Sequence, residues 1–161
     1  MVTITAIALD DDVIAGLLAA QQDEMASYYG GEGGSGAPPR GEEFLPPAGV
    51  FLAARRDGEI IGCGGICRLD EGVAELRRMY VAPAARGLGI GRQLLAALES
   101  AAVELGYSSI RLETGFRQRE AIGLYESAGF RRGDCWGPYL SDPKSVCYEK
   151  PLGHFSQSPT S

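Results

Sequence analysis

Three glycines at alternate positions between two arginines form the segment of this sequence best suited to hold a ligand. The segment consists of Arg86, Gly87, Leu88, Gly89, Ile90, Gly91 and Arg92. A strand-like run at 76–81 precedes it, and a helical pattern at 93–105 follows it. Glycine lets the backbone approach a ligand closely, and the first N–H groups of a helix lack intrahelical partners at the positive end of its dipole. The sequence therefore predicts a phosphate-binding corner here.

The glycine spacing separates this corner from two familiar phosphate-binding loops. A P-loop requires a lysine directly after a glycine, and no glycine in this sequence is followed by lysine. The dinucleotide fingerprint requires Gly-x-Gly-x-x-Gly, whereas the corner has Gly-x-Gly-x-Gly. Glu113 stands roughly where that fold places its ribose-binding acid, but only one crossover follows the corner. Dinucleotide binding is thus the weaker alternative, and a turn that only packs a helix on a sheet would not need the flanking arginines.

The patterns around the corner predict a mixed α/β domain. We expect strands at 2–9, 50–56, 59–67, 73–81, 109–114, 130–135 and 145–150, and helices at 13–30, 93–105 and 118–128. A right-handed crossover would make 73–81 and 109–114 parallel neighbours, with the ligand at their carboxyl ends. The glycine- and proline-rich region 30–49 fits a functional lid or a disordered loop equally well.

The strand at 73–81 changes the side on which its apolar residues lie. The two sets with opposite parity are Ala74 with Leu76 and Met79 with Val81. A bulge at positions 77–78 would restore one continuous apolar face, and bulges often lie beside active sites. A strand that is buried on both faces would explain the pattern equally well.

Composition limits the class of protein. The 161 residues, 45% hydrophobic and 22% charged, predict one globular domain at 1–152 followed by a flexible polar tail at 153–161. The formal net charge of −6 argues against a nucleic-acid-binding protein. No apolar run is long enough for a membrane span, and the N-terminus lacks the pattern of a signal peptide, so we expect no membrane partner and a cytoplasmic location.

The cysteines offer no metal site. Cys63, Cys67, Cys135 and Cys147 have spacings that match no zinc pattern, and the one histidine, His154, lies in the tail. We therefore expect reduced, mostly buried cysteines and no metal.

Two ordered motifs resemble one protein family. Residues 81–91, Val-Ala-Pro-Ala-Ala-Arg-Gly-Leu-Gly-Ile-Gly, resemble motif A of the GNAT superfamily of acyl-CoA-dependent N-acetyltransferases. In that family a strand ending in Val-x-Pro leads into Arg/Gln-x-x-Gly-x-Gly/Ala, and Arg86, Gly89 and Gly91 fill those positions. Residues 120–130 are similar to its motif B, Ala-x-x-Leu-Tyr-x-x-x-Gly-Phe. The resemblance covers roughly residues 2–151.

The resemblance implies a fold and a cofactor site. The fold would be a GNAT-like α/β (mixed α+β) structure: a mixed, mostly antiparallel sheet of about seven strands, with helices on both faces and a splayed parallel pair. Acetyl-CoA would place its pyrophosphate on the backbone amides of 86–92. Its pantetheine arm would pair with the backbone of Met79, Tyr80 and Val81 like an added strand. Gln118 stands where the family often has asparagine, and would contact the same arm.

The resemblance also implies two catalytic groups for the attack of an amine on a thioester. Tyr125 matches the family position of the acid that protonates the leaving thiolate; the alternative is a tyrosine packed against its own helix face. Glu75 is the candidate base, since a primary amine must lose a proton before it attacks. The alternative for Glu75 is an exposed glutamate paired with an arginine. Glu113 is a third carboxylate that could act as base or pair with Arg77 or Arg111.

These implications lead to one preferred function. We expect an enzyme that transfers acetyl from acetyl-CoA directly to a primary amine of a small molecule or peptide. The alternative is a GNAT-like module that binds acyl-CoA without chemistry. Tyr28, Tyr29, Tyr139 and Asp142 are weaker candidates for the border of the acceptor site. The sequence leaves open the acceptor's identity and the oligomeric state, a homodimer included.

Overall fold

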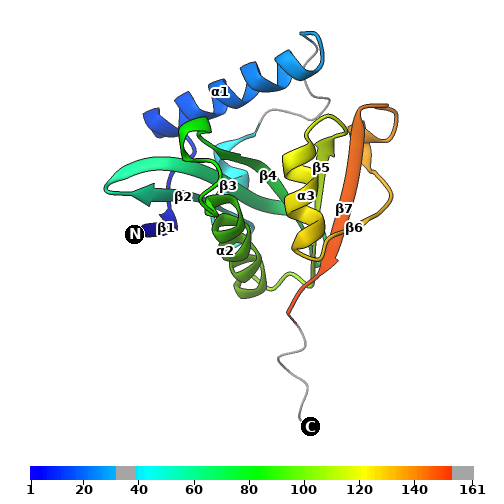
Figure 1. Ribbon diagram of the computed structural model, residues 1–161. Helices are drawn as coiled ribbons and strands as arrows, with labels where there is room; N and C mark the ends of the chain where they lie inside the picture. The colour runs from blue at the N-terminus through cyan, green and yellow to red at the C-terminus, as the bar shows by residue number, and fades with distance from the viewer. Residues whose placement is uncertain (32–38, 154–161) are drawn as a thin grey trace.

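A computed structural model describes residues 1–31 and 39–153, and within them seven strands form one sheet with three α-helices (Figure 1). The strands are β1 (Val2–Ala6), β2 (Val50–Arg56), β3 (Glu59–Asp70), β4 (Val73–Val81), β5 (Ser109–Gly115), β6 (Arg131–Arg132) and β7 (Ser145–Pro151). The α-helices are α1 (Asp12–Tyr28), α2 (Ile90–Glu104) and α3 (Arg119–Ser127), and the short 3₁₀ helices are η1 (Gly41–Phe44), η2 (Pro83–Ala85) and η3 (Gly137–Tyr139). The predicted mixed, mostly antiparallel α/β fold is confirmed.

One parallel pair lies at the centre of the sheet. The strand order is β1-β2-β3-β4-β5-β7-β6, and every neighbouring pair is antiparallel except β4 and β5. Pairing between β4 and β5 ends at Leu76 with Leu112, although β4 continues to Val81 and β5 to Gly115. The two strands therefore part toward their carboxyl ends, which opens the sheet where a ligand was expected.

Helices cover both faces of the sheet. The larger core contains buried residues of α2 and α3 against one face of the central strands, such as Leu98 and Tyr125 against Ile110 and Leu112. The smaller core joins α1 and η1 to the opposite face, where Ile14 belongs to a cluster with buried side chains of β2 and β3. In Figure 1, α1 crosses one side of the sheet, and α2 and α3 lie on the other. No helix in the described ranges is long and apolar enough to cross a membrane.

The bulge in β4 is confirmed. Cys63 pairs with Tyr80 and Gly65 with Arg77, so two residues of β4 oppose one residue of β3. Arg78, within the bulge, has a φ of 60°. The extra residue turns the strand so that its apolar side chains before and after the bulge pack against the same core, while Tyr80 faces α1. Glu75 consequently lies on the face opposite to Met79 and Val81.

The expectation of four reduced cysteines is wrong for one pair. Cys135 and Cys147 form a disulfide with their Cα atoms 5.3 Å apart, whereas Cys63 and Cys67 are free and buried. The antiparallel pairing of β6 with β7 brings the chain after β6 beside Cys147, whose carbonyl accepts a hydrogen bond from the Gly133 N–H at 3.0 Å. The two cysteines are 12 residues apart in the sequence, and this spacing alone does not indicate that β7 pairs with β6 and brings them together.

Several element boundaries also differ from the predictions. The strand expected at 130–135 is limited to two residues, because only Arg131 and Arg132 find partners on β7. The first strand ends at Ala6, and β3 extends to Asp70. The predicted lid or loop at 30–49 lies partly outside the described residues, as does nearly all of the predicted tail at 153–161.

Candidate active site

A cleft of about 660 Å³ opens beside the glycine corner. Its walls come from α1, the end of β4, the 86–92 segment and the first turns of α3. Six of the seven residues predicted in the corner line it, and the seventh, Leu88, does not and is 53% exposed. The predicted ligand corner is therefore part of a cavity large enough for an extended molecule.

The corner presents backbone N–H groups as predicted. Helix α2 begins at Ile90, three residues earlier than its periodicity suggested, so the glycine segment itself forms the helix start. Gly89 is the N-cap with φ 80°, and no side chain caps the helix. Gly87 also has a positive φ, 84°, and no atom lies within 4 Å of a Cβ placed at either glycine. The open space and the uncapped N–H groups suit an anionic oxygen.

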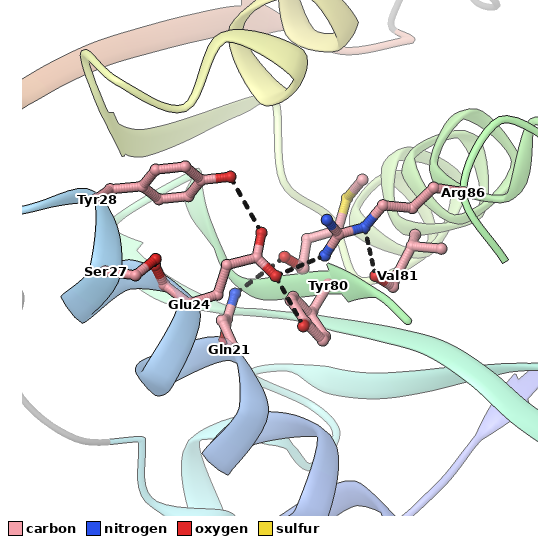
Figure 2. Close-up of polar contacts among 8 residues, drawn as sticks. Gln21, Glu24, Ser27, Tyr28, Tyr80, Val81 and Arg86 are labelled. Atoms are coloured by element: carbon pink, nitrogen blue, oxygen red, sulfur yellow. Dashed lines mark hydrogen bonds and ion pairs between the residues drawn. The ribbon is translucent and has the colours of Figure 1, made fainter. Parts of the chain in front are cut away.

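The side chain of Arg86 is directed toward α1 (Figure 2). Its Nη2 atom donates to Glu24 Oε1 at 2.9 Å, and its Nε atom donates to the Val81 carbonyl at 3.0 Å. The hydroxyls of Tyr80 and Tyr28 also donate to the Glu24 carboxylate, at 3.0 and 3.2 Å. The hydrogen bond from Arg86 lowers the pKa of Glu24. The guanidinium thus ties α1 to the end of β4 and holds one wall of the cleft.

Glu24 belongs to a row of α1 residues of which the sequence had indicated only Tyr28 as a site residue. Gln21, Glu24, Met25 and Tyr28 all line the cleft. Their spacing of three and four residues places them on one helix face, which is the one signal that could have indicated a shared role. Gln21 donates from Nε2 to the Met79 carbonyl at 3.0 Å.

The backbone of β4 lines the cleft where the added strand was expected. Met79, Tyr80 and Val81 all contribute to its wall. The carbonyls of Met79 and Val81 already accept hydrogen bonds from Gln21 and Arg86. A ligand that pairs with this segment through those carbonyls would therefore use their second lone pairs or displace a side chain.

A second, smaller cavity of about 120 Å³ lies where β4 and β5 part. Five residues line both cavities and so mark their junction: Gln21, Met25, Met79, Gln118 and Tyr125. The small cavity also contains Glu75, Arg77 and Arg78 from β4, Glu113 from β5, and Tyr139. Tyr139, one of the weaker candidates from the sequence, thus lines this cavity.

Tyr125 is both packed in the core and part of the junction. Its side chain is 6% exposed, and its ring lies 5.9 Å from that of Phe130 and 6.5 Å from that of Tyr148. Burial and the nearby charge of Glu113 raise the pKa of Tyr125. The phenol is consequently protonated at neutral pH and can donate a proton to a group in either cavity.

Two carboxylates lie in the small cavity, that of Glu75 buried and that of Glu113 half-buried. Glu75 is 9% exposed, and burial raises its pKa, as does the negative charge of Glu113. Burial likewise raises the pKa of Glu113, which accepts a hydrogen bond from the Ser145 hydroxyl at 2.7 Å. A carboxylate with a raised pKa is a better proton acceptor than a solvated one. Glu75 is not the exposed, ion-paired glutamate that was the alternative.

Gln118 links the start of α3 to the end of β5. It occupies the N-cap position, and its Oε1 atom accepts a hydrogen bond from the Gly115 N–H at 2.8 Å. The side chain lines both cavities, as the predicted contact with a ligand requires. Its oxygen is already engaged, so the amide nitrogen is the atom better placed to serve a ligand.

The remaining candidates separate into two groups. Tyr28 lines the large cleft. Tyr29 instead accepts a hydrogen bond from the Arg117 N–H at 3.2 Å, and Asp142 forms an ion pair with Lys144 at 3.3 Å.

Comparisons with known proteins agree with this geometry. Residues 17–130 match the model of the Acetyltransferase (GNAT) family. The chain is 48% identical over 103 residues to an IAA acetyltransferase of Azospirillum brasilense, covering 63% of this chain and 67% of that protein.

Two solved structures share the fold. One, a candidate acyl-CoA N-acyltransferase of Klebsiella pneumoniae, is 38% identical with a TM-score of 0.80, over 95% of this chain and 99% of that one. The other is the PaiA N-acetyltransferase of Thermoplasma acidophilum in complex with coenzyme A, at 20% identity and a TM-score of 0.69, over 94% and 99% of the two chains.

Proposed function

Since the chain belongs to the GNAT family of acetyltransferases, we propose that it transfers an acetyl group from acetyl-CoA to a primary amine of a small molecule or peptide. The observation that carries this proposal is the junction at Tyr125. There a long cleft with an uncapped helix start meets a small cavity that contains two carboxylates. The Thermoplasma acidophilum neighbour, which has coenzyme A bound, supports the choice of donor.

The donor would lie along the large cleft. Its pyrophosphate would accept hydrogen bonds from the N–H groups of residues 87–92 at the start of α2. Its pantetheine arm would follow β4 past Met79 and Gln118, which brings the thioester to the junction. Arg86 would act on this site mainly by holding Glu24 and thereby α1, because its guanidinium is already bonded to the Glu24 carboxylate and to the Val81 carbonyl.

The acceptor would enter the small cavity. Glu75 removes a proton from the ammonium group, and the amine nitrogen then attacks the thioester carbonyl carbon. The C–S bond breaks as the new C–N bond is completed, and the departing thiolate takes the phenol proton of Tyr125. The acylated nitrogen loses its second proton, which returns to the Tyr125 phenolate, and Glu75 releases its proton to solvent. The products are the N-acetylated amine and the free thiol of coenzyme A.

Release of coenzyme A thiol in the presence of a panel of primary amines tests this function. We expect thiol release that depends on the amine and equals the amount of N-acetylated product detected by mass spectrometry. Thiol release without an added amine measures background hydrolysis. Saturable acetyl-CoA binding with no amine-dependent release over the panel would instead support the non-catalytic acyl-CoA-binding module.

Substitution Gly89→Val tests the phosphate corner. A branched residue at φ 80° strains the backbone that presents the N–H groups, so we expect the Kd for acetyl-CoA to rise by about tenfold or more. Gly106→Val is the matched control, because Gly106 follows the other end of α2, also has a positive φ (94°), and also has no neighbour within 4 Å of an added Cβ. Isothermal titration should find the loss of affinity in the first variant alone; an equal loss in both would assign it to strain in α2.

A further inference from the structure

Arg78 differs from Arg77 and Arg86, the two other arginines that lie on or directly after β4. It lies in the β4 bulge with φ 60°, a left-handed conformation that arginine rarely adopts. Arg77 forms an ion pair with Glu43 at 3.3 Å, and Arg86 forms one with Glu24 at 2.9 Å. Within residues 1–31 and 39–153, the Arg78 guanidinium has neither a hydrogen bond nor an ion pair, although the residue is half-buried in the small cavity. A partly buried guanidinium without a partner is suited to bind an oxyanion.

A second polar group at the junction also lacks a partner. The Oε1 atom of Gln21 is buried and accepts no hydrogen bond from the described residues, while Nε2 of the same amide donates to the Met79 carbonyl. Because the amide nitrogen must face the Met79 carbonyl to donate this bond, the unpartnered atom is the amide oxygen, which can only accept. A buried acceptor without a donor is costly, and a ligand N–H would satisfy it.

The small cavity contains charges of both signs, which suits a ligand with one positively and one negatively charged group. Glu75 and Glu113 supply negative charge, and Arg78 supplies positive charge. The groups nearest to Arg78 do not neutralise its positive charge. Arg77 carries the same charge, and Tyr139 is a neutral phenol whose pKa burial raises to about 12. The cavity volume of about 120 Å³ restricts the bound part to a small group.

We propose that the acceptor is an amine that also carries a carboxylate, such as an amino acid. In this arrangement the carboxylate binds Arg78, and the amine donates to Gln21 Oε1 next to Glu75. The inference rests on the proposed N-acetyl transfer and specifies the class of acceptor.

Pairs of acceptors with and without the carboxylate test the proposal. Each pair consists of an amino acid and its neutral amide, for example phenylalanine and phenylalaninamide, with leucine, methionine and lysine pairs alongside. The wild-type chain should acetylate the acid of at least one pair with kcat/KM about 10- to 100-fold above that of its amide, the range of a charge-assisted hydrogen bond. Arg78→Gln should abolish this ratio by lowering kcat/KM for the acid alone, and Arg78→Lys should restore part of it.

Two further variants separate specificity from damage to the fold. Arg111→Gln is the control, because Arg111 pairs with Glu149 at 3.2 Å, lies on a neighbouring strand and lines neither cavity; it should leave the ratio unchanged. Gln21→Leu should raise KM for both members of a pair by the same factor, because both members have the amine.

The outcomes distinguish failure of the proposed acceptor class from failure of the proposed N-acetyl transfer. Equal use of acids and amides by the wild-type chain, or an equal loss for both in Arg78→Gln, would overturn the carboxylate assignment and leave N-acetyl transfer in place. A Gln21→Leu variant altered only in the KM for acetyl-CoA would overturn the role of Gln21. Absence of transfer to any amine, acid or neutral, would overturn the proposed function itself.

Discussion

Replacing Tyr125 with phenylalanine is expected to lower kcat by about 100-fold or more and to leave the Kd for acetyl-CoA nearly unchanged. The substitution removes the phenol that protonates the leaving thiolate. It keeps the ring that packs against Phe130 and Tyr148, so the fold and the cleft should persist. Steady-state kinetics give kcat, and isothermal titration gives the Kd.

Tyr148→Phe is the matched control. The ring of Tyr148 neighbours that of Tyr125, but its hydroxyl donates to Glu126 Oε2 at 2.7 Å and lines neither cavity. The control should lose about 1 kcal/mol of stability with the hydrogen bond and keep its kcat. An unchanged kcat in Tyr125→Phe would remove Tyr125 from the mechanism and leave it a packing residue.

Replacing Glu75 with glutamine is expected to lower kcat/KM by about 100-fold or more at neutral pH. A base acts only when deprotonated, so the wild-type rate should rise with pH through the pKa of Glu75. Burial and the charges of Glu113 and Glu43 raise this pKa above that of an ordinary carboxyl, while Arg77 and a hydrogen bond with Tyr139 oppose the rise. The acidic limb of the pH–rate profile should therefore lie above the usual carboxyl range, and Glu75→Gln should abolish it.

Glu113→Gln separates the two carboxylates. It removes a like charge next to Glu75, which lowers the pKa of Glu75, so the acidic limb should persist and move to lower pH. If instead Glu113→Gln abolishes the limb and Glu75→Gln retains it, Glu113 is the base. If both variants keep the acidic limb, neither carboxylate accepts the proton in the rate-determining step.

The sequence was sufficient to predict features that depend on local patterns. The corner at Gly89 follows from glycine spacing at the start of a helix, and the strand and helix order follows from hydrophobic periodicity. The bulge at Arg78 was visible as a change of parity within one strand, although only the pairing of β3 with β4 decided between it and the doubly buried strand. The roles of Tyr125 and Glu75 in catalysis stay predictions.

The sequence by itself thus determined the order of elements, the glycine-rich start of α2 and the family motifs, because each is set by neighbours along the chain. Only the tertiary structure decided which distant groups meet. Packing of α1 on the sheet brings Glu24 to Arg86, the return of β7 joins Cys147 to Cys135, and the splay of β4 from β5 leaves Arg78 without a partner among the described residues. Such contacts depend on how surfaces far apart in sequence pack together, and no local periodicity specifies them.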